Sequence, residues 1–301
     1  MPSRLTRPTP RHFDLTQAVT TYGYSVLAPN HWDQNTQTLH RPLTIRGKVI
    51  HTRITHAGLT CGEQRRTKRS SAQVRIHCDP TLPRPDHQPL KRQVARMLHL
   101  DTPPALYRDF WKLHRPARSA GFGRIFRSPT LFEDIIKTIT GCNVAWANTK
   151  SMNRLLCEKI GTAGAFPTPP EIARCAPSEL KRKCKVGYRA QRIIRFARDV
   201  DSGRLNLAWF EDPTRSTPEL YEALRKIHGI GDYAANNILQ HLDRYDRLPV
   251  DSETLRHFRQ VHRHDGDAKQ IAAAARDYYD RFAPFQFLAY WYELWHRTSV
   301  G

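Results

Sequence analysis

The residues in this chain best suited to chemistry lie between positions 227 and 251. Two glycines, Gly229 and Gly231, flank one aliphatic residue, and small residues follow them. A single acid, Asp251, stands twenty positions beyond the second glycine. This spacing is typical of a tight hairpin that can hold a phosphate, with one carboxylate placed beside it.

Backbone properties predict the hairpin itself. Gly229 and Gly231 accept left-handed or crowded backbone angles, and neither has a Cβ that would keep a phosphate away from main-chain N–H groups. We expect the second helix to begin near Asp232, so that its N-terminal dipole faces the phosphate. Ile230 is expected to anchor the hairpin in the core. Taken alone, a Gly-Ile-Gly turn is also compatible with no binding role.

Asp251 has two interpretations. Pro249 restricts the residue before it to extended backbone, and a helix is expected to begin at Ser252. The carboxylate of Asp251 therefore either caps that helix or lies at the mouth of a pocket beside the hairpin. Both roles are compatible, because a cap would fix the orientation of the carboxylate.

The charge balance indicates a polyanionic partner. The 301 residues include 48 Lys and Arg against 28 Asp and Glu, a formal net charge of +20. Such a field favours nucleic acid, and basic stretches such as 65–69 are expected to face DNA or solvent. The six cysteines contain no C-x-x-C pair, which argues against a zinc or iron–sulfur centre. No apolar run is long enough to span a membrane, and the N-terminus lacks the core of a secretory signal.

The hydrophobic pattern divides the chain near residues 79–85, a proline-rich linker. Before the linker, apolar residues alternate as in half-buried strands: Leu43, Ile45, Gly47 and Val49, then Val74 and Ile76. After it, apolar residues follow helical spacing: Leu131, Ile135, Ile136 and Ile139, then Met152, Leu155 and Leu156, and finally Phe285, Leu288, Tyr292 and Trp295. The prediction is an α+β protein. A small antiparallel β-sheet domain with its linker (1–91) precedes a mostly α-helical domain (92–301), whose last helices could pack back on the first domain.

Residues 227–251 resemble the helix–hairpin–helix motif, with its Gly/Pro-rich loop and aspartate, of the DNA glycosylase superfamily called HhH-GPD. Further resemblance covers the helix pair before the family's damage-probing loop, the Gly-Tyr-Arg-Ala turn of the 8-oxoguanine and alkylpurine branches, and their last helix. The matching segments are 132–143, 152–157, 186–190 and 283–295. The similarity extends over about residues 120–300, and more loosely over the β domain.

The resemblance implies base excision from damaged DNA. The family's essential aspartate falls on Asp251, where a carboxylate would stabilise an oxocarbenium-like sugar and orient a water. The damaged base must first leave the stack. Asn143 matches a residue that family members place near the gap, and Tyr188 and Arg189 match residues that wedge the duplex and touch the orphan base. A loop cap at Asn143 and helix packing at Tyr188 are the structural alternatives.

One departure from the family pattern concerns the reaction. Bifunctional members carry a lysine two residues beyond the second hairpin glycine, and its amine attacks the sugar. Here that position is Tyr233, so we expect a monofunctional glycosylase that leaves an abasic site. The backbone contacts with DNA are expected from Lys226, His228, Gly229 and Gly231.

Aromatic residues are expected to line the base pocket, with Trp146, Tyr233, Phe285 and Tyr290 at matching positions. Rings stack well on cationic bases, which favours alkylated purines. The Gly-Tyr-Arg-Ala turn favours oxidised purines instead, and a modified pyrimidine is also compatible. Phe285 and Trp146 have ordinary core packing as their alternative role.

No cofactor is expected to be required. The resemblance allows a monovalent cation (Na⁺ or K⁺) at the backbone carbonyls of Ile227 and Ile230. His257, His262 and His264 share one segment, but we expect no partner acids to complete a metal triad with them. The expected partner is double-stranded DNA with a damaged or modified base, bound by a monomer that is cytoplasmic in a bacterium, nuclear in a eukaryote and not secreted. The alternative function is a non-catalytic protein that binds damaged or distorted DNA.

Overall fold

The computed structural model describes residues 3–11, 13–57 and 72–300, and of residues 298–300 it describes the backbone alone. The basic stretch 65–69 and Cys61 lie outside these residues. The chain forms two compact units, the first made of Met1–Thr102 and Arg124–Leu205, the second of Pro103–Gly123 and Asn206–Gly301. This division differs from the predicted boundary after residue 91, because the sheet shares one unit with the helices between residues 131 and 201.

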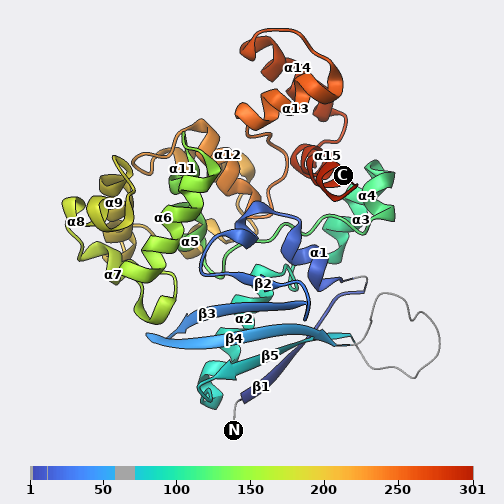
Figure 1. Ribbon diagram of the computed structural model, residues 1–301. Coiled ribbons are helices and arrows are strands. Elements are labelled where there is room, and N and C mark those ends of the chain that lie inside the picture. Colours follow the sequence, from blue (N-terminus) through green and yellow to red (C-terminus); the bar gives the residue numbers. More distant parts are fainter. Residues whose placement is uncertain (1–2, 12, 58–71, 301) are drawn as a thin grey trace, which may run out of the picture. The chain divides into compact units, whose positions relative to one another are not determined.

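The first unit begins with a five-stranded antiparallel sheet in the order β1-β5-β4-β3-β2 (Figure 1). The prediction of an N-terminal antiparallel sheet followed by helices is confirmed. Helix α2 packs against β1 and β3. The strands are β1 (Ser3–Pro8), β2 (His31–Asp33), β3 (Thr38–Ile45), β4 (Lys48–Ala57) and β5 (Gln73–Asp79), and α1 (Leu15–Thr20), η1 (Gly23–Val26), η2 (Arg84–Asp86) and α2 (His87–Met97) accompany them.

The alternating segment 43–49 is a hairpin and not one strand. Arg46 and Gly47 have φ angles of 48° and 77°, so the chain reverses between β3 and β4. Val49 consequently lies opposite Thr44 in the neighbouring strand. The buried face therefore changes parity across the turn: Leu43 and Ile45 are buried in β3, whereas Ile50 and Ile54 are buried in β4, so Val49 does not continue the face of Leu43.

The remaining helices of the first unit lie between residues 131 and 201. They are α5 (Leu131–Gly141), α6 (Trp146–Lys159), η3 (Thr162–Gly164), α7 (Pro169–Ala173), α8 (Pro177–Cys184) and α9 (Arg189–Asp201). Thr130 caps α5 by accepting a hydrogen bond from the N–H of Glu133. The apolar residues that predicted α5 and α6 are buried.

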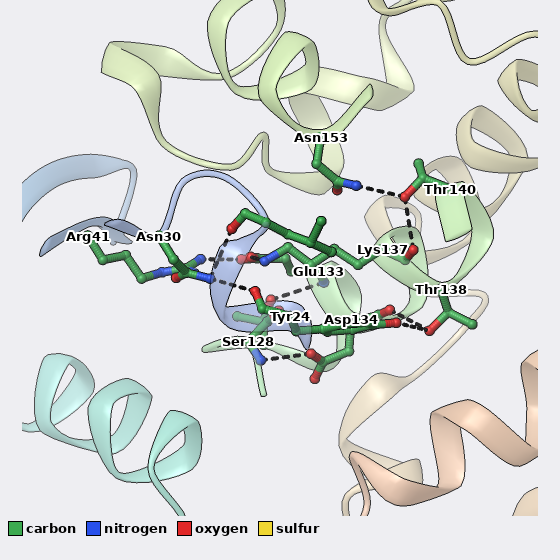
Figure 2. Close-up of polar contacts among 12 residues, drawn as sticks. Tyr24, Asn30, Arg41, Ser128, Glu133, Asp134, Lys137, Thr138, Thr140 and Asn153 are labelled. Carbon is green, nitrogen blue, oxygen red and sulfur yellow. Dashed lines mark hydrogen bonds and ion pairs between the residues drawn. The ribbon is translucent and has the colours of Figure 1, made fainter. Parts of the chain in front are cut away.

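A buried charge cluster joins β3 to α5 (Figure 2). The guanidinium of Arg41 donates to Glu133 Oε2 at 2.5 Å, and the Lys137 ammonium lies 2.7 Å from Glu133 Oε1. Farther along α5, Asn153 of α6 donates to Thr140 Oγ1 at 2.9 Å. These contacts fix α5 between the sheet and α6, and thereby fix where the loop after α5 begins.

The described residues of the second unit form helices and connecting loops, without strands. Its helices are α3 (Pro104–Leu113), α4 (Arg115–Ser119), α10 (Leu207–Phe210), α11 (Thr217–Arg225), α12 (Asp232–Gln240), α13 (Ser252–His262), α14 (Ala268–Asp280) and α15 (Gln286–Val300). Its core is aromatic, and Phe110 packs against Phe285 while Phe122 packs against Tyr292. None of the described helices is both long enough and apolar enough to cross a membrane.

Candidate functional site

The predicted hairpin connects α11 to α12 in the second unit. Gly229 has a φ of 87°, which only glycine adopts without strain. The N–H of Ile230 donates to the Ile227 carbonyl at 3.0 Å and closes the turn, and both isoleucines are buried. The hairpin is thus anchored by its aliphatic residues, as predicted.

Gly231 is the N-cap of α12 and has an extended backbone, with φ −86° and ψ −179°. A Cβ added here would meet only the Arg225 guanidinium at 3.7 Å, an ordinary contact distance. The prediction of a left-handed or crowded angle is therefore wrong for Gly231. The absence of a side chain leaves the backbone here open to the close approach of a ligand.

The outer face of the hairpin is cationic. Arg225, Lys226 and His228 are exposed, and they precede the N-terminus of α12. The first N–H groups of a helix have no partner within the helix and carry the positive end of its dipole. The arrangement provides an anion site of the kind that binds a phosphate.

Arg225 was not singled out from the sequence, although it contacts the hairpin directly. Its Nη1 donates to the Ile230 carbonyl at 3.2 Å. A guanidinium therefore already lies at one of the two carbonyls predicted to bind a monovalent cation, while the Ile227 carbonyl accepts the turn hydrogen bond. That cation site stays a prediction.

Tyr221 forms a hydrogen bond with Asp232, the acid at the start of α12, and Arg247 packs on Tyr221. The phenol of Tyr221 donates to Asp232 Oδ1, and this hydrogen bond raises the pKa of Tyr221. The guanidinium of Arg247 lies 4.2 Å from the centroid of the Tyr221 ring. Asp232 is therefore hydrogen-bonded to a neutral donor on α11, and the ring of that donor contacts the Arg247 guanidinium.

Asp251 caps α13. Its Oδ1 accepts a hydrogen bond from the N–H of Thr254 at 2.9 Å, and its own N–H donates to Thr254 Oγ1 at 3.3 Å. Such a capping box fixes the side-chain rotamer of the cap residue. The carboxylate is half-buried, and the cap uses Oδ1, so that Oδ2 is the oxygen left for another task.

Tyr290 of α15 supports the cap from a second element. Its hydroxyl lies 3.0 Å from Thr254 Oγ1, and the side chain is 3% exposed. Burial raises the pKa of Tyr290 well above that of a free phenol; the hydrogen bond from Thr254 offsets part of that rise, and the nearby acids Asp251 and Glu253 add to it. The phenol is therefore neutral at all ordinary pH values, and its oxygen accepts the hydrogen bond from Thr254.

The predicted aromatic residues of this unit differ in their accessibility. Tyr233 is half-buried, and its hydroxyl accepts a hydrogen bond from Asn237 at 3.1 Å. Phe285 is buried against Phe110 just before α15, which is the core packing role named as its alternative. Of these predicted pocket residues, Tyr290 contacts the Asp251 cap through Thr254, and Tyr233 interacts electrostatically with Tyr290.

In the first unit, the predicted probing residues come together around the loop after α5. Asn143 is exposed there with a φ of 51°, a left-handed angle that asparagine tolerates. The guanidinium of Arg189 donates to the carbonyls of Cys142 and Asn143. Arg189 is only 6% exposed. Its geometry therefore suits the positioning of the Asn143 loop better than direct contact with an orphan base.

Tyr188, like Asn143, is exposed. It lies at the N-terminus of α9, after Gly187 with a φ of 58°, and 54% of its surface is exposed. The guanidinium groups of Arg189 and Arg192 lie 4.6 Å and 4.9 Å from its ring centroid. An exposed ring in contact with two guanidinium groups is suited to insertion between bases, and ordinary helix packing does not account for it.

Trp146 begins α6 and is 43% exposed. Its indole packs on Gly23, where an added Cβ would come within 3.3 Å of the ring. The first unit also contains a hollow of about 440 Å³ over the sheet, lined by His31, His40, His51 and His77 among others. None of the predicted site residues lines this hollow.

Solved structures of known proteins share the fold over the full chain. The 3-methyladenine DNA glycosylase from Archaeoglobus fulgidus is 18% identical, with a TM-score of 0.70, and the match covers 98% of each chain. The 8-oxoguanine glycosylase/lyase from Clostridium acetobutylicum in its apo form is 18% identical, with a TM-score of 0.66 over 98% of this chain and 97% of that chain. The same enzyme in complex with double-stranded DNA containing cytosine opposite to 8-oxoG has 19% identity and a TM-score of 0.65 over 99% and 98%.

The chain has the fold of these DNA glycosylases. Its sequence matches no protein-family profile and no curated protein. Within the glycosylase fold, Thr254 could have been found from sequence, because its place three residues after Asp251 is that of a capping box. Arg225, Tyr221 and Tyr290 act through contacts that the local sequence does not predict.

Proposed function

We propose that the protein is a monofunctional DNA glycosylase that extrudes a damaged or modified base and hydrolyses its N-glycosidic bond. The observation that carries the proposal is the half-buried carboxylate of Asp251, held rigidly at the start of α13. A protein that only binds DNA could cap α13 with an uncharged serine or threonine and would avoid a carboxylate that repels the phosphate backbone. A glycosylase requires one.

In the proposed reaction, the bond between sugar and base breaks as positive charge develops on the sugar. Asp251 Oδ2 stabilises that charge and orients the water that adds to the sugar carbon, while Oδ1 remains in the cap. The electron pair of the broken bond leaves with the base. The water loses its proton to solvent, and the product is an abasic site.

The nature of residue 233 supports hydrolysis over strand cleavage. A lyase needs an amine to form a Schiff base with the sugar, and Tyr233 offers a phenol instead. Lys226, the nearest lysine in the hairpin segment, is exposed at the end of α11 and suits a phosphate contact. We therefore propose base release without a covalent intermediate.

We propose that alkylated purines are the favoured substrates. Exposed or half-buried rings, Trp146 and Tyr233 in their respective units, can stack on a cationic base, whose glycosidic bond is already weakened. Oxidised purines and modified pyrimidines are tested alongside them. The names of the structural neighbours include both a 3-methyladenine and an 8-oxoguanine enzyme.

The deciding experiment measures bases released from alkylated, oxidised and deaminated DNA by mass spectrometry. Wild type is expected to release at least one base, and Asp251→Asn to release it at least about a hundredfold more slowly. Asp265→Asn is the matched control, because it removes an exposed carboxylate elsewhere in the same unit. If Asp251→Asn retains full activity, the proposed mechanism is wrong.

The alternative, a non-catalytic binder of damaged DNA, has its own outcome in this experiment. It would bind lesion-containing duplex more tightly than undamaged duplex and release no base from the whole panel. Borohydride trapping of a protein–DNA adduct, by contrast, would show a bifunctional enzyme and contradict the assignment based on Tyr233.

A further inference from the structure

Side chains of α13 and α15 that are separated in the sequence bring three potential metal-ligand atoms together. His257 and His262 each place Nε2 at 3.1 Å from Glu293 Oε2 of α15. The three donor atoms all lie within 4.8 Å of one another. The expectation that no acid completes a metal site with these histidines is therefore wrong, because the fold supplies Glu293.

The surroundings of the cluster hold the donors in place. The His262 ring stacks on Phe258 with centroids 4.4 Å apart, and the centroid of the tilted Tyr278 ring lies 4.2 Å from that of His262. The phenol of Tyr279 donates to Glu293 Oε2 at 2.6 Å, which orients the carboxylate. The side chain of His257 is 1% exposed, whereas those of His262 and Glu293 are 16% and 22% exposed. His257 is therefore the buried member of the cluster, and His262 and Glu293 are partly accessible to solvent.

The donor set and its spacing suit a transition-metal ion. Zn²⁺ binds imidazole nitrogen and carboxylate oxygen at about 2.0–2.2 Å, which sets tetrahedral donors about 3.3 Å apart. The two separations from Glu293 are already 3.1 Å. The two imidazoles need to approach each other by at most about 1.5 Å, and His262 is the last residue of α13, where the helix no longer constrains the backbone that follows.

We propose that His257, His262 and Glu293 form a zinc site that ties the C-terminal end of α13 to α15. Tyr279 serves as the outer partner that orients the carboxylate, a role typical of metal centres. The fourth position faces solvent and takes a water. The site lies at the opposite end of α13 from Asp251, and its ligand His257 contacts Tyr290 edge to face at 5.8 Å. Metal binding would thus stabilise the two helices that hold the Asp251 cap, independently of any base-excision activity.

The test uses untagged full-length protein stripped of metal with a chelator and then titrated with ZnCl₂ in a calorimeter. Wild type is expected to bind one equivalent, and its thermal midpoint is expected to rise with zinc. His262→Ala is expected to weaken binding by more than about tenfold. His264→Ala is the matched control, because this neighbouring histidine lies outside the cluster and binds Gly266 N–H instead. Circular dichroism checks that each variant is folded.

Substitution of CoCl₂ identifies the donors independently. Ligation by nitrogen and oxygen gives visible bands alone, whereas a cysteine thiolate would add intense near-ultraviolet absorption. Visible bands that are lost in His262→Ala and Glu293→Gln but kept in His264→Ala support the site. The proposal is overturned if wild type shows no saturable binding at about 100 μM zinc, or if both variants bind like wild type. Thiolate absorption would also overturn it.

Discussion

Thr254 and Asp251 cap α13 reciprocally, with the N–H of each residue donating to the side-chain oxygen of the other at 2.9 Å and 3.3 Å. The hydroxyl of Thr254 is also 3.0 Å from that of Tyr290 on α15. The proposed catalytic carboxylate is therefore oriented from two helices. Its direction depends on a threonine that would not itself touch the substrate.

Thr254→Ala tests this dependence. The backbone N–H still caps through Asp251 Oδ1, but the hydroxyl contacts to Asp251 and Tyr290 are lost. We expect kcat for base release to fall by up to about a hundredfold, because small misplacements of a reacting group are costly. The free energy of unfolding should fall by about 1 kcal/mol, and the Kd for lesion-containing DNA should change little. Thr254→Ser, which keeps the hydroxyl, should restore most of the rate. Equal rates for Ala and wild type would show that the capping box does not position Asp251.

Arg189→Ala tests the positioning of the Asn143 loop. The buried guanidinium donates to two consecutive carbonyls, so its removal leaves them without that donor. We expect slower base extrusion, measured by the fluorescence of 2-aminopurine placed beside the lesion, while binding to undamaged duplex is retained. Arg192→Ala is the control, because it removes a cation beside Tyr188 without touching the loop. Equal extrusion rates in both variants would assign the effect to Tyr188 instead.

Acid sensitivity is expected from the buried cluster around Glu133. Burial alone would raise the pKa of Glu133, but Arg41 and Lys137 hold it below the ordinary value. A depressed carboxyl pKa stabilises the fold above the unfolded pKa of about 4.3, and that stabilisation is lost as the pH falls from there through the folded pKa. Glu133→Gln leaves the two buried cations, Arg41 and Lys137, without a negatively charged partner. This should lower the free energy of unfolding by about 3–5 kcal/mol at pH 7.

Urea unfolding of wild type and Glu133→Gln between pH 3 and 7 measures this difference. The gap in unfolding free energy should narrow below a pH of about 4.3, because wild type then loses the same charge. Glu253→Gln, which removes an exposed ion pair with Arg256, should cost no more than about 1 kcal/mol at any pH. A gap that is independent of pH would mean that Glu133 acts by packing and not by charge.

The local features of the site could be predicted from sequence because their causes are local. The left-handed backbone angle at position 229 requires glycine. The helices after Gly231 and Asp251 begin where these two N-cap residues predict. The conformation of Gly231 and the turn at Arg46–Gly47 were the local exceptions. In both, the residue pattern fits more than one backbone path.

The remaining features depend on contacts between distant segments, which local periodicity does not encode. Arg189 contacts the Cys142 carbonyl across 47 residues, and Arg41 contacts Glu133 across 92. Glu293 reaches His257 across 36 residues. These polar side chains are wholly or largely withdrawn from solvent because the fold brings each a partner of complementary charge or hydrogen bonding, so a hydrophobic pattern gives no sign of them.

Lys226→Ala tests the hairpin as a phosphate site. Lys226 is exposed at the end of α11, beside the N-terminus of α12, where a phosphate would lie among cationic side chains and helix N–H groups. Loss of one phosphate contact should reduce the slope of log K against log salt concentration by about one, equally for damaged and undamaged duplex. The rate of base release from saturated enzyme should be unchanged. Lys112→Ala is the control, because the charge of Lys112 is already balanced by Asp109 at 2.7 Å, so the slope should stay that of wild type. A salt slope unaffected by Lys226→Ala would place the DNA backbone elsewhere on the protein, whereas a slope that changes only for damaged duplex would make Lys226 a lesion-specific contact.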